Sequence, residues 1–314
     1  MGDILFSIRL FFMKFLSAIF FLVVIALLLG TDSLVAIDQN AIQGDAIAGG
    51  RLYDNWMVEL DLNPPDGNQP IWDRQSDSTR SGRVTWRCKE CHGWDYQGAE
   101  GVFGPDAIRY TGFSGVAGTI GLNIEEVKAW LNGSNDPEHN FLELTNSGVL
   151  DDLTAFLLTM QVDTNLLLDR QTGLSYGDEV NGRNLFISAC AECHGVSGRS
   201  INFATAGNPL FIADVAIADP WRTIHRTRFG LPASNKPASE ELGWSLREVS
   251  DVLAYMQSLP AVNPNYTIFS SDRDLPADEV QGSIRPIIWT TSLILVIIIF
   301  GVSLDFVEKR PSRS

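Results

Sequence analysis

The strings CKECHG, residues 88–93, and CAECHG, residues 190–195, decide the fold of this chain. They contain all four cysteines and two of the four histidines among its 314 residues. In each string two thiols stand three positions apart, and a histidine follows the second thiol directly. Random placement of so few cysteines and histidines would produce one such string in roughly one chain in a thousand. Two copies therefore indicate a chemical requirement that is met twice.

Each string predicts the covalent attachment of a haem. Two thiols at this spacing form thioether bonds to the two vinyl groups of one haem, and the next residue reaches the iron. A disulfide framework, a redox thiol pair and a zinc site are the alternatives, but none of them needs a histidine at the same offset twice. The predicted cofactors are two haem c groups with iron, and the predicted haem-binding residues are Cys88, Cys91, His92, Cys190, Cys193 and His194.

The segments that flank the two strings also resemble each other, which predicts two modules in tandem. GRLY, residues 50–53, precedes the first string, and GRNLF, residues 182–186, precedes the second. Apolar residues at helical spacing predict a terminal amphipathic helix in each module, at residues 147–161 and 245–260. The predicted fold class is therefore all-α.

Equivalent residues in the two terminal helices support the repeat. Asp152 matches Asp251, and Phe156 matches Tyr255. The domain boundaries that follow are module 1 at residues 37–165 and module 2 at residues 175–262. Module 1 differs by an insertion at residues 60–83, whose many Pro, Asp and Ser residues predict a surface loop.

Several longer stretches resemble a family of bacterial membrane-anchored dihaem cytochromes c. They are GGRLYDNW (49–56), SGRVTWRCKECHGWDYQGAEG (81–101), YTGFSGV (110–116), ACAECHGVSGRSINF (189–203) and DPWRTIHRTRFGLP (219–232). The likeness covers most of residues 37–262. It implies two all-α cytochrome c folds and an electron-transfer role, commonly alongside membrane cytochromes.

The iron of each haem needs a sixth ligand for pure electron transfer, and this is usually Met or His. In module 1 no methionine lies between Cys91 and the terminal helix, so His139, thirteen residues before Asp152, is the predicted sixth ligand. A histidine at both axial positions would give this haem a lower potential than a His/Met site.

Module 2 leaves the sixth ligand open. The resembled family has Met-Pro just before the last helix, where this chain has Lys236-Pro237. His225 is the competing ligand, although a histidine there can also bind a haem propionate. A vacant iron is the third alternative. Met256 lies within the terminal helix and matches Leu157, so it is expected to pack in the core.

The two ends of the chain predict membrane contact. An apolar run at residues 15–30 follows Arg9 and Lys14, which is typical of either a signal peptide or an N-terminal anchor within residues 1–36. Residues 286–304 contain no charge and are long enough to span a bilayer. Residues 263–283 would then be a polar linker, and residues 305–314 would be a cytoplasmic tail.

Basic residues fix the expected orientation. Lys309, Arg310 and Arg313 follow the apolar run, while only Arg285 precedes it closely. The positive-inside rule then leaves the haem modules on the periplasmic side of the cell inner membrane. The net charge is −15, which excludes nucleic acid as a partner.

These features predict electron transfer outside the cytoplasm, by a carrier or complex subunit of a respiratory chain. The expected partners are the membrane and redox proteins such as a membrane cytochrome b or a quinol-oxidising complex. The alternative function is that of a dihaem enzyme such as a peroxidase, in which the second haem is open. A sensor or structural haem domain is a third class, for which the sequence contains no positive sign.

Overall fold

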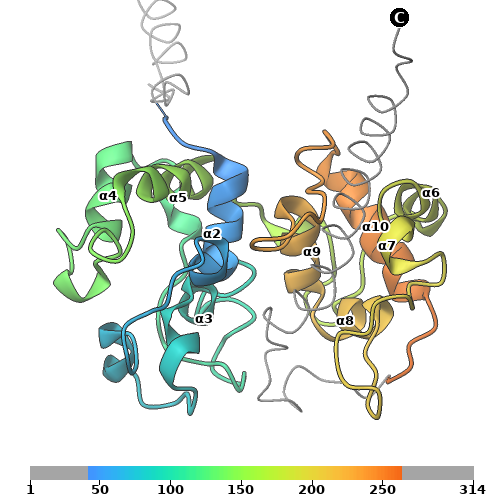
Figure 1. The fold of residues 1–314 in the computed structure, drawn as a ribbon, viewed down its shortest axis with the longest axis horizontal. Helices are drawn as coiled ribbons and strands as arrows, with labels where there is room; N and C mark the ends of the chain where they lie inside the picture. The colour runs from blue at the N-terminus through green and yellow to red at the C-terminus, as the bar shows by residue number, and fades with distance from the viewer. Residues whose placement is uncertain (1–41, 264–314) are drawn as a thin grey trace, which may run out of the picture. The chain divides into compact units, whose positions relative to one another are not determined.

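A computed structural model describes residues 42–263, which all belong to one compact unit (Figure 1). In this range the chain forms α-helices and short 3-10 turns, with isolated bridges but no β-strand. The all-α prediction agrees with these residues. None of their helices is long and apolar enough to cross a membrane. The signal peptide or anchor, nearly all of the 263–283 linker, the predicted span at 286–304 and the tail lie outside the described residues.

The first half of the described chain is organised around the crossing of α2 (Ala46–Glu59) and α5 (Ser147–Thr159). Asp45 begins α2, since its side chain accepts hydrogen bonds from the first free backbone N–H groups. The helices touch at Gly49, where a Cβ would lie 2.1 Å from the Asp152 carbonyl oxygen. The Asp152 carboxylate also accepts a 2.7 Å hydrogen bond from the Asp45 backbone N–H.

The second half repeats this crossing with α6 (Glu179–Ala189) and α10 (Leu246–Ser258). Asp178 begins α6, and its N–H donates a 2.6 Å hydrogen bond to the Asp251 carboxylate. A Cβ on Gly182 would lie only 1.8 Å from the Asp251 carbonyl oxygen. The predicted match of Asp152 with Asp251 is confirmed. The glycine equivalent to Gly182 is Gly49, one residue earlier than the string comparison indicated.

The remaining helices cover these two pairs. They are α3 (Cys88–His92), α4 (Ile124–Leu131), α7 (Ala191–His194), α8 (Ile212–Ala218) and α9 (Pro220–Phe229). Helix α4 packs on α5, α8 packs on α10, and α9 packs on both α10 and α2. Met256 is buried in the second core beside Phe186 and Val252, as predicted.

The insertion in module 1 is more ordered than the predicted surface loop. It contains one 3-10 turn, η1 (Pro70–Arg74), and begins a second, η2 (Gly82–Trp86). Most of its residues are exposed, but Trp72 is buried and its indole N–H donates to the Arg80 carbonyl at 3.0 Å. A buried tryptophan gives this polar segment a small apolar centre of its own.

The segment between the modules packs with module 2. After the short turn η5 (Thr164–Leu166), Leu167 and Leu168 are buried in the same apolar cluster as Phe186 and Val252. The Ser175 hydroxyl donates a 2.7 Å hydrogen bond to the Ser250 carbonyl oxygen. The segment between the modules is therefore part of the apolar core of module 2.

Candidate haem sites

The first site is built on α3, which begins at Cys88 and ends at His92. One helical turn brings both thiols and the histidine onto neighbouring positions. The helix ends because Gly93 takes a positive φ of 76°, a conformation that other residues rarely adopt. The Tyr53 hydroxyl donates to the Gly93 carbonyl at 2.6 Å, so α2 holds the end of the attachment helix.

His92 and His139 each form a hydrogen bond to a backbone carbonyl through the same ring nitrogen, Nδ1. The Nδ1 of His92 lies 2.8 Å from the Ser114 carbonyl, and the Nδ1 of His139 lies 2.9 Å from the Trp130 carbonyl. A carbonyl only accepts, so each Nδ1 carries the proton and each Nε2 retains its lone pair. This is the tautomer that binds a metal through Nε2.

The two rings are spaced for a shared metal ion. Their centroids lie 6.3 Å apart, with ring planes 79° apart. Metal–nitrogen bonds of about 2 Å to each ring fit within that separation. Burial, together with His139, lowers the pKa of His92 to about 4, and burial also lowers the pKa of His139. Both rings are therefore neutral at pH 7, as a metal ligand must be. The structure thus brings together the two histidines that were predicted for the first haem.

The inserted segment clamps the turn that carries His139, and the sequence did not predict this clamp. His139 ends the 3-10 turn η4 (Pro137–His139), which Asp136 caps. The Arg74 guanidinium donates two hydrogen bonds to the Asp136 carboxylate, at 2.6 and 3.0 Å, and pairs with Glu138. The Gln69 amide donates to the Glu138 carbonyl at 2.8 Å. Only module 1 has both the insertion and a candidate distal histidine. Their occurrence in the same module was the one sequence signal for a contact between them.

The second site is built on α7, with Cys190 as its N-cap residue and Cys193 and His194 within it. Gly195 ends the helix with a φ of 71°, as Gly93 ends α3. The Nδ1 of His194 is buried and has no hydrogen-bond partner. The equivalent Nδ1 of His92 lies against the Ser114 carbonyl, so the two predicted proximal histidines differ at this atom. Burial, reinforced by the charge of Lys236, lowers the pKa of His194 to about 4.

The comparison with family models concerns this second site. Residues 179–260 match the model described as Cytochrome c. This part of the chain is a cytochrome c domain. The match implies covalently bound haem c with iron and supports a role in haem-based electron transfer. No curated protein and no solved structure matches the chain.

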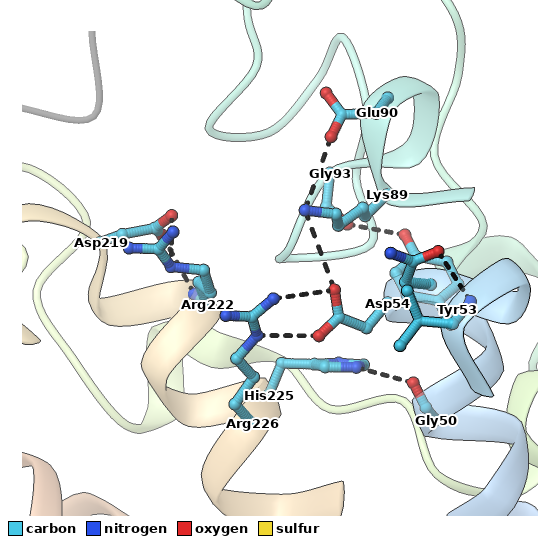
Figure 2. A network of polar contacts seen from close by, with 12 residues as sticks. Gly50, Tyr53, Asp54, Lys89, Glu90, Gly93, Asp219, Arg222, His225 and Arg226 are labelled. Carbon is cyan, nitrogen blue, oxygen red and sulfur yellow. Dashed lines mark hydrogen bonds and ion pairs between the residues drawn. The ribbon is translucent and has the colours of Figure 1, made fainter. Parts of the chain in front are cut away.

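His225 of the cytochrome c domain is directed at Gly50 of α2, in the first half of the chain (Figure 2). His225 is fully buried on α9, where its Nε2 lies 2.9 Å from the Gly50 carbonyl and its Nδ1 lies 2.8 Å from the Tyr96 hydroxyl. The carbonyl accepts the Nε2 proton, so Nδ1 accepts from Tyr96. Both ring nitrogens are therefore occupied by residues of the first half of the chain. This geometry argues against the prediction that His225 is the sixth ligand of the second haem.

Lys236 remains as the candidate sixth ligand for the iron of the cytochrome c domain. Its charge acts on both Cys190 and His194, and burial lowers its own pKa to about 8. Its Nζ donates to the Arg226 carbonyl. A lysine binds iron only as the neutral amine, and a lowered pKa makes that form easier to reach. Ligation by Lys236 stays a prediction.

Proposed function

We propose that the chain is a dihaem cytochrome c that transfers single electrons through two covalently attached haems. The observation that carries the proposal is the pair formed by His92 and His139. Outside the matched domain, module 1 has two cysteines and a histidine on one short helix, with a second neutral histidine ring 6.3 Å from the first. This set fits a haem held on both faces.

A haem with both axial positions filled has no position left for a substrate, so it exchanges electrons and does not bind small ligands. In module 1 the backbone carbonyls of Ser114 and Trp130 orient the two imidazoles through their Nδ1 protons. Such carbonyls raise the basicity of a ligating imidazole. Bis-histidine ligation would give this haem the lower potential of a His/His site.

A membrane position is the second part of the proposal. Residues 286–304 form a charge-free run of spanning length, and the N-terminal run at residues 15–30 has the composition of a signal peptide or anchor. A tether of this kind raises the effective concentration of the haem modules near membrane redox proteins without any new contact. The partner class we propose is a membrane cytochrome b or quinol-oxidising complex in the periplasm-facing part of a respiratory chain.

One observation favours a second function, that of a dihaem peroxidase. His225 is engaged elsewhere, so among the described residues the candidate ligand left for the second iron is Lys236. If that lysine does not bind, the second iron has an open position, as a peroxidase requires. Lys236 is therefore the residue that separates the two functions.

The test uses the full chain in detergent. Intact-protein mass spectrometry counts the covalent haems, and electron paramagnetic resonance with and without carbon monoxide reports their ligation. We expect two haems, both low-spin and indifferent to carbon monoxide. His139→Ala should convert one haem to a high-spin, gas-binding form, and Lys236→Ala should convert the other. His225→Gln is the matched control and should leave both low-spin.

A mass that corresponds to one haem would refute the dihaem proposal. If the unchanged protein binds carbon monoxide at the haem that His139→Ala leaves unaltered, the carrier proposal fails and the peroxidase gains support. Peroxide turnover of the full chain would then decide between the two functions.

A further inference from the structure

The two most distinctive stretches of the sequence, residues 81–101 and 219–232, contact each other in the structure. The first contains the attachment helix α3 of module 1, and the second contains α9 of module 2. Figure 2 shows their polar contacts, which converge on α2. In these two stretches the predicted haem attachment accounts only for Cys88, Cys91 and His92. The contact accounts for several of the rest.

Asp54 is the centre of the contact. Its carboxylate is buried on α2 and accepts two hydrogen bonds from Arg226 of module 2, at 2.8 and 3.2 Å. The Lys89 ammonium of α3 also approaches this carboxylate, at 3.8 Å. Lys89 lies between Cys88 and Cys91, and its side chain is only 2% exposed. A charge from module 2 therefore reaches the segment to which the first haem would be attached.

Aromatic rings pack around these charged groups. The ring centroid of His225 lies 5.2 Å from that of Trp94, and the Lys89 ammonium lies 4.3 Å from the Trp94 centroid. The His225–Tyr96 hydrogen bond joins α9 to the residues that follow the first string. The side chains of Asp54 and Lys89 are buried, so water screens their charges little, while the Arg226 side chain is 30% exposed.

A side chain of module 2 also approaches the α2 backbone of module 1 closely here. A Cβ on Gly50 would lie 2.3 Å from the Phe229 ring, so this part of α2 is fitted to α9. Burial alone would raise the pKa of Asp54, but Arg226 and Lys89 outweigh it and hold that pKa well below its ordinary value. Asp54 is therefore a fixed negative charge over the neutral pH range.

We propose that the ion pair between Asp54 of module 1 and Arg226 of module 2 sets the potential of the first haem, so that module 2 supplies part of the environment of the haem in module 1. This inference rests on the proposed function, because it requires a haem on Cys88 and Cys91. It makes Arg226 and Asp54 positioning residues that act through charge. Neither residue has to touch the iron.

The sign of the effect follows from electrostatics. Oxidation adds one positive charge at the iron, and a nearby negative charge stabilises that state. Arg226→Gln leaves the Asp54 carboxylate less compensated, so the potential of the first haem should fall. Asp54→Asn removes the negative charge and should raise the same potential. The double variant removes one charge of each sign, so its potential should return toward that of the unchanged protein.

The experiment is a spectroelectrochemical titration of the full chain in detergent, in which each haem gives one wave. The wave of the first haem is the one that His139→Ala alters. Arg247→Gln is the matched control, since it removes an exposed arginine of module 2 at the start of α10. Arg226→Lys keeps the charge and should restore most of the potential. Haem content by mass accompanies every variant.

The expected result is a shift of the first wave only, downward for Arg226→Gln and upward for Asp54→Asn, each larger than the shift caused by Arg247→Gln. Shifts that are equal in both waves, or no larger than the control, would overturn the inference while leaving the dihaem proposal intact. Shifts of the same sign for both variants would also overturn it, because they would indicate disturbed packing. A single haem by mass would instead refute the proposed function itself.

Discussion

The two modules share one helix crossing but differ in what they place opposite the attachment helix. In both, an aspartate on the terminal helix accepts the N–H of the aspartate that begins the first helix, and a glycine lets the backbones meet. Opposite His92 stands His139, held by an inserted segment. The corresponding region of module 2 contains Lys236 and no histidine. The two modules therefore share the crossing, while their loops supply different candidate iron ligands.

The crossing should be the most sensitive feature of both modules. Gly49→Ala would force a Cβ to within 2.1 Å of the Asp152 carbonyl, and Gly182→Ala would force one to within 1.8 Å of the Asp251 carbonyl. We expect each to cost about 3 kcal/mol or more of unfolding free energy, since neither backbone can yield cheaply. Thermal unfolding with haem absorbance as the probe measures this. Gly118→Ala meets no atom within 4 Å and is the control. Equal losses in control and test variants would contradict the shared crossing.

The difference in candidate ligands between the modules can be tested by replacing the distal histidine of module 1. His139→Met replaces an imidazole with a thioether at the distal position. A thioether favours the ferrous state, so the potential of the first haem should rise, on the order of 0.1 V within the roughly 0.8 V that axial ligands span. Potentiometric titration measures the change. An unchanged potential would show that His139 is not an iron ligand, whatever the ring spacing.

The buried His225, which joins the two modules, should make the unfolding free energy fall as the pH is lowered. Burial lowers the pKa of His225 to about 3 from an ordinary 6.5, so between these values the unfolded chain binds a proton that the folded chain does not. The contribution of His225 to stability is therefore full above pH 6.5 and is lost as pH falls toward 3, by up to about 1.4 kcal/mol per pH unit. Urea unfolding at several pH values measures it.

His225→Gln is the comparison for that series, since its amide can still donate to Gly50 and accept from Tyr96. The variant should have a flatter dependence of unfolding free energy on pH than the unchanged protein between pH 6 and about 4. Parallel curves for the two proteins would show that His225 is already protonated or solvated in the folded state.

The smallest effect is expected for the clamp on the distal turn. Arg74→Ala removes the pairs with Asp136 and Glu138, which are exposed and so contribute little to overall stability. Without these pairs the turn that carries His139 should move away from the first haem more often. Carbon monoxide should then bind the reduced first haem a few-fold faster. Flash photolysis measures this rate. Lys128→Ala breaks an ion pair with Asp151 elsewhere in module 1 and should leave the rate unchanged.

Local patterns predicted the two attachment strings, the terminal helices and the equivalence of Asp152 and Asp251. His139 could be singled out as the candidate distal ligand because module 1 contains no rival, and the structure places its ring close to that of His92. His225 could not be placed, because its partners Gly50 and Tyr96 are 175 and 129 residues away in the chain. A histidine in a cytochrome-like string is a plausible ligand until such long-range contacts are known. The Arg74 clamp was missed for a similar reason, since a polar insertion carries no periodic signal.

The burial of Leu167 and Leu168 in the core of module 2 has a consequence for how such proteins recombine. A gene exchange with its breakpoint at codon 175 would transfer a second module without two of its core leucines, and would leave those leucines exposed at the end of the first. A breakpoint near codon 163 would transfer a complete core. Recombination that exchanges module 2 should therefore also transfer residues 163–175, which precede it.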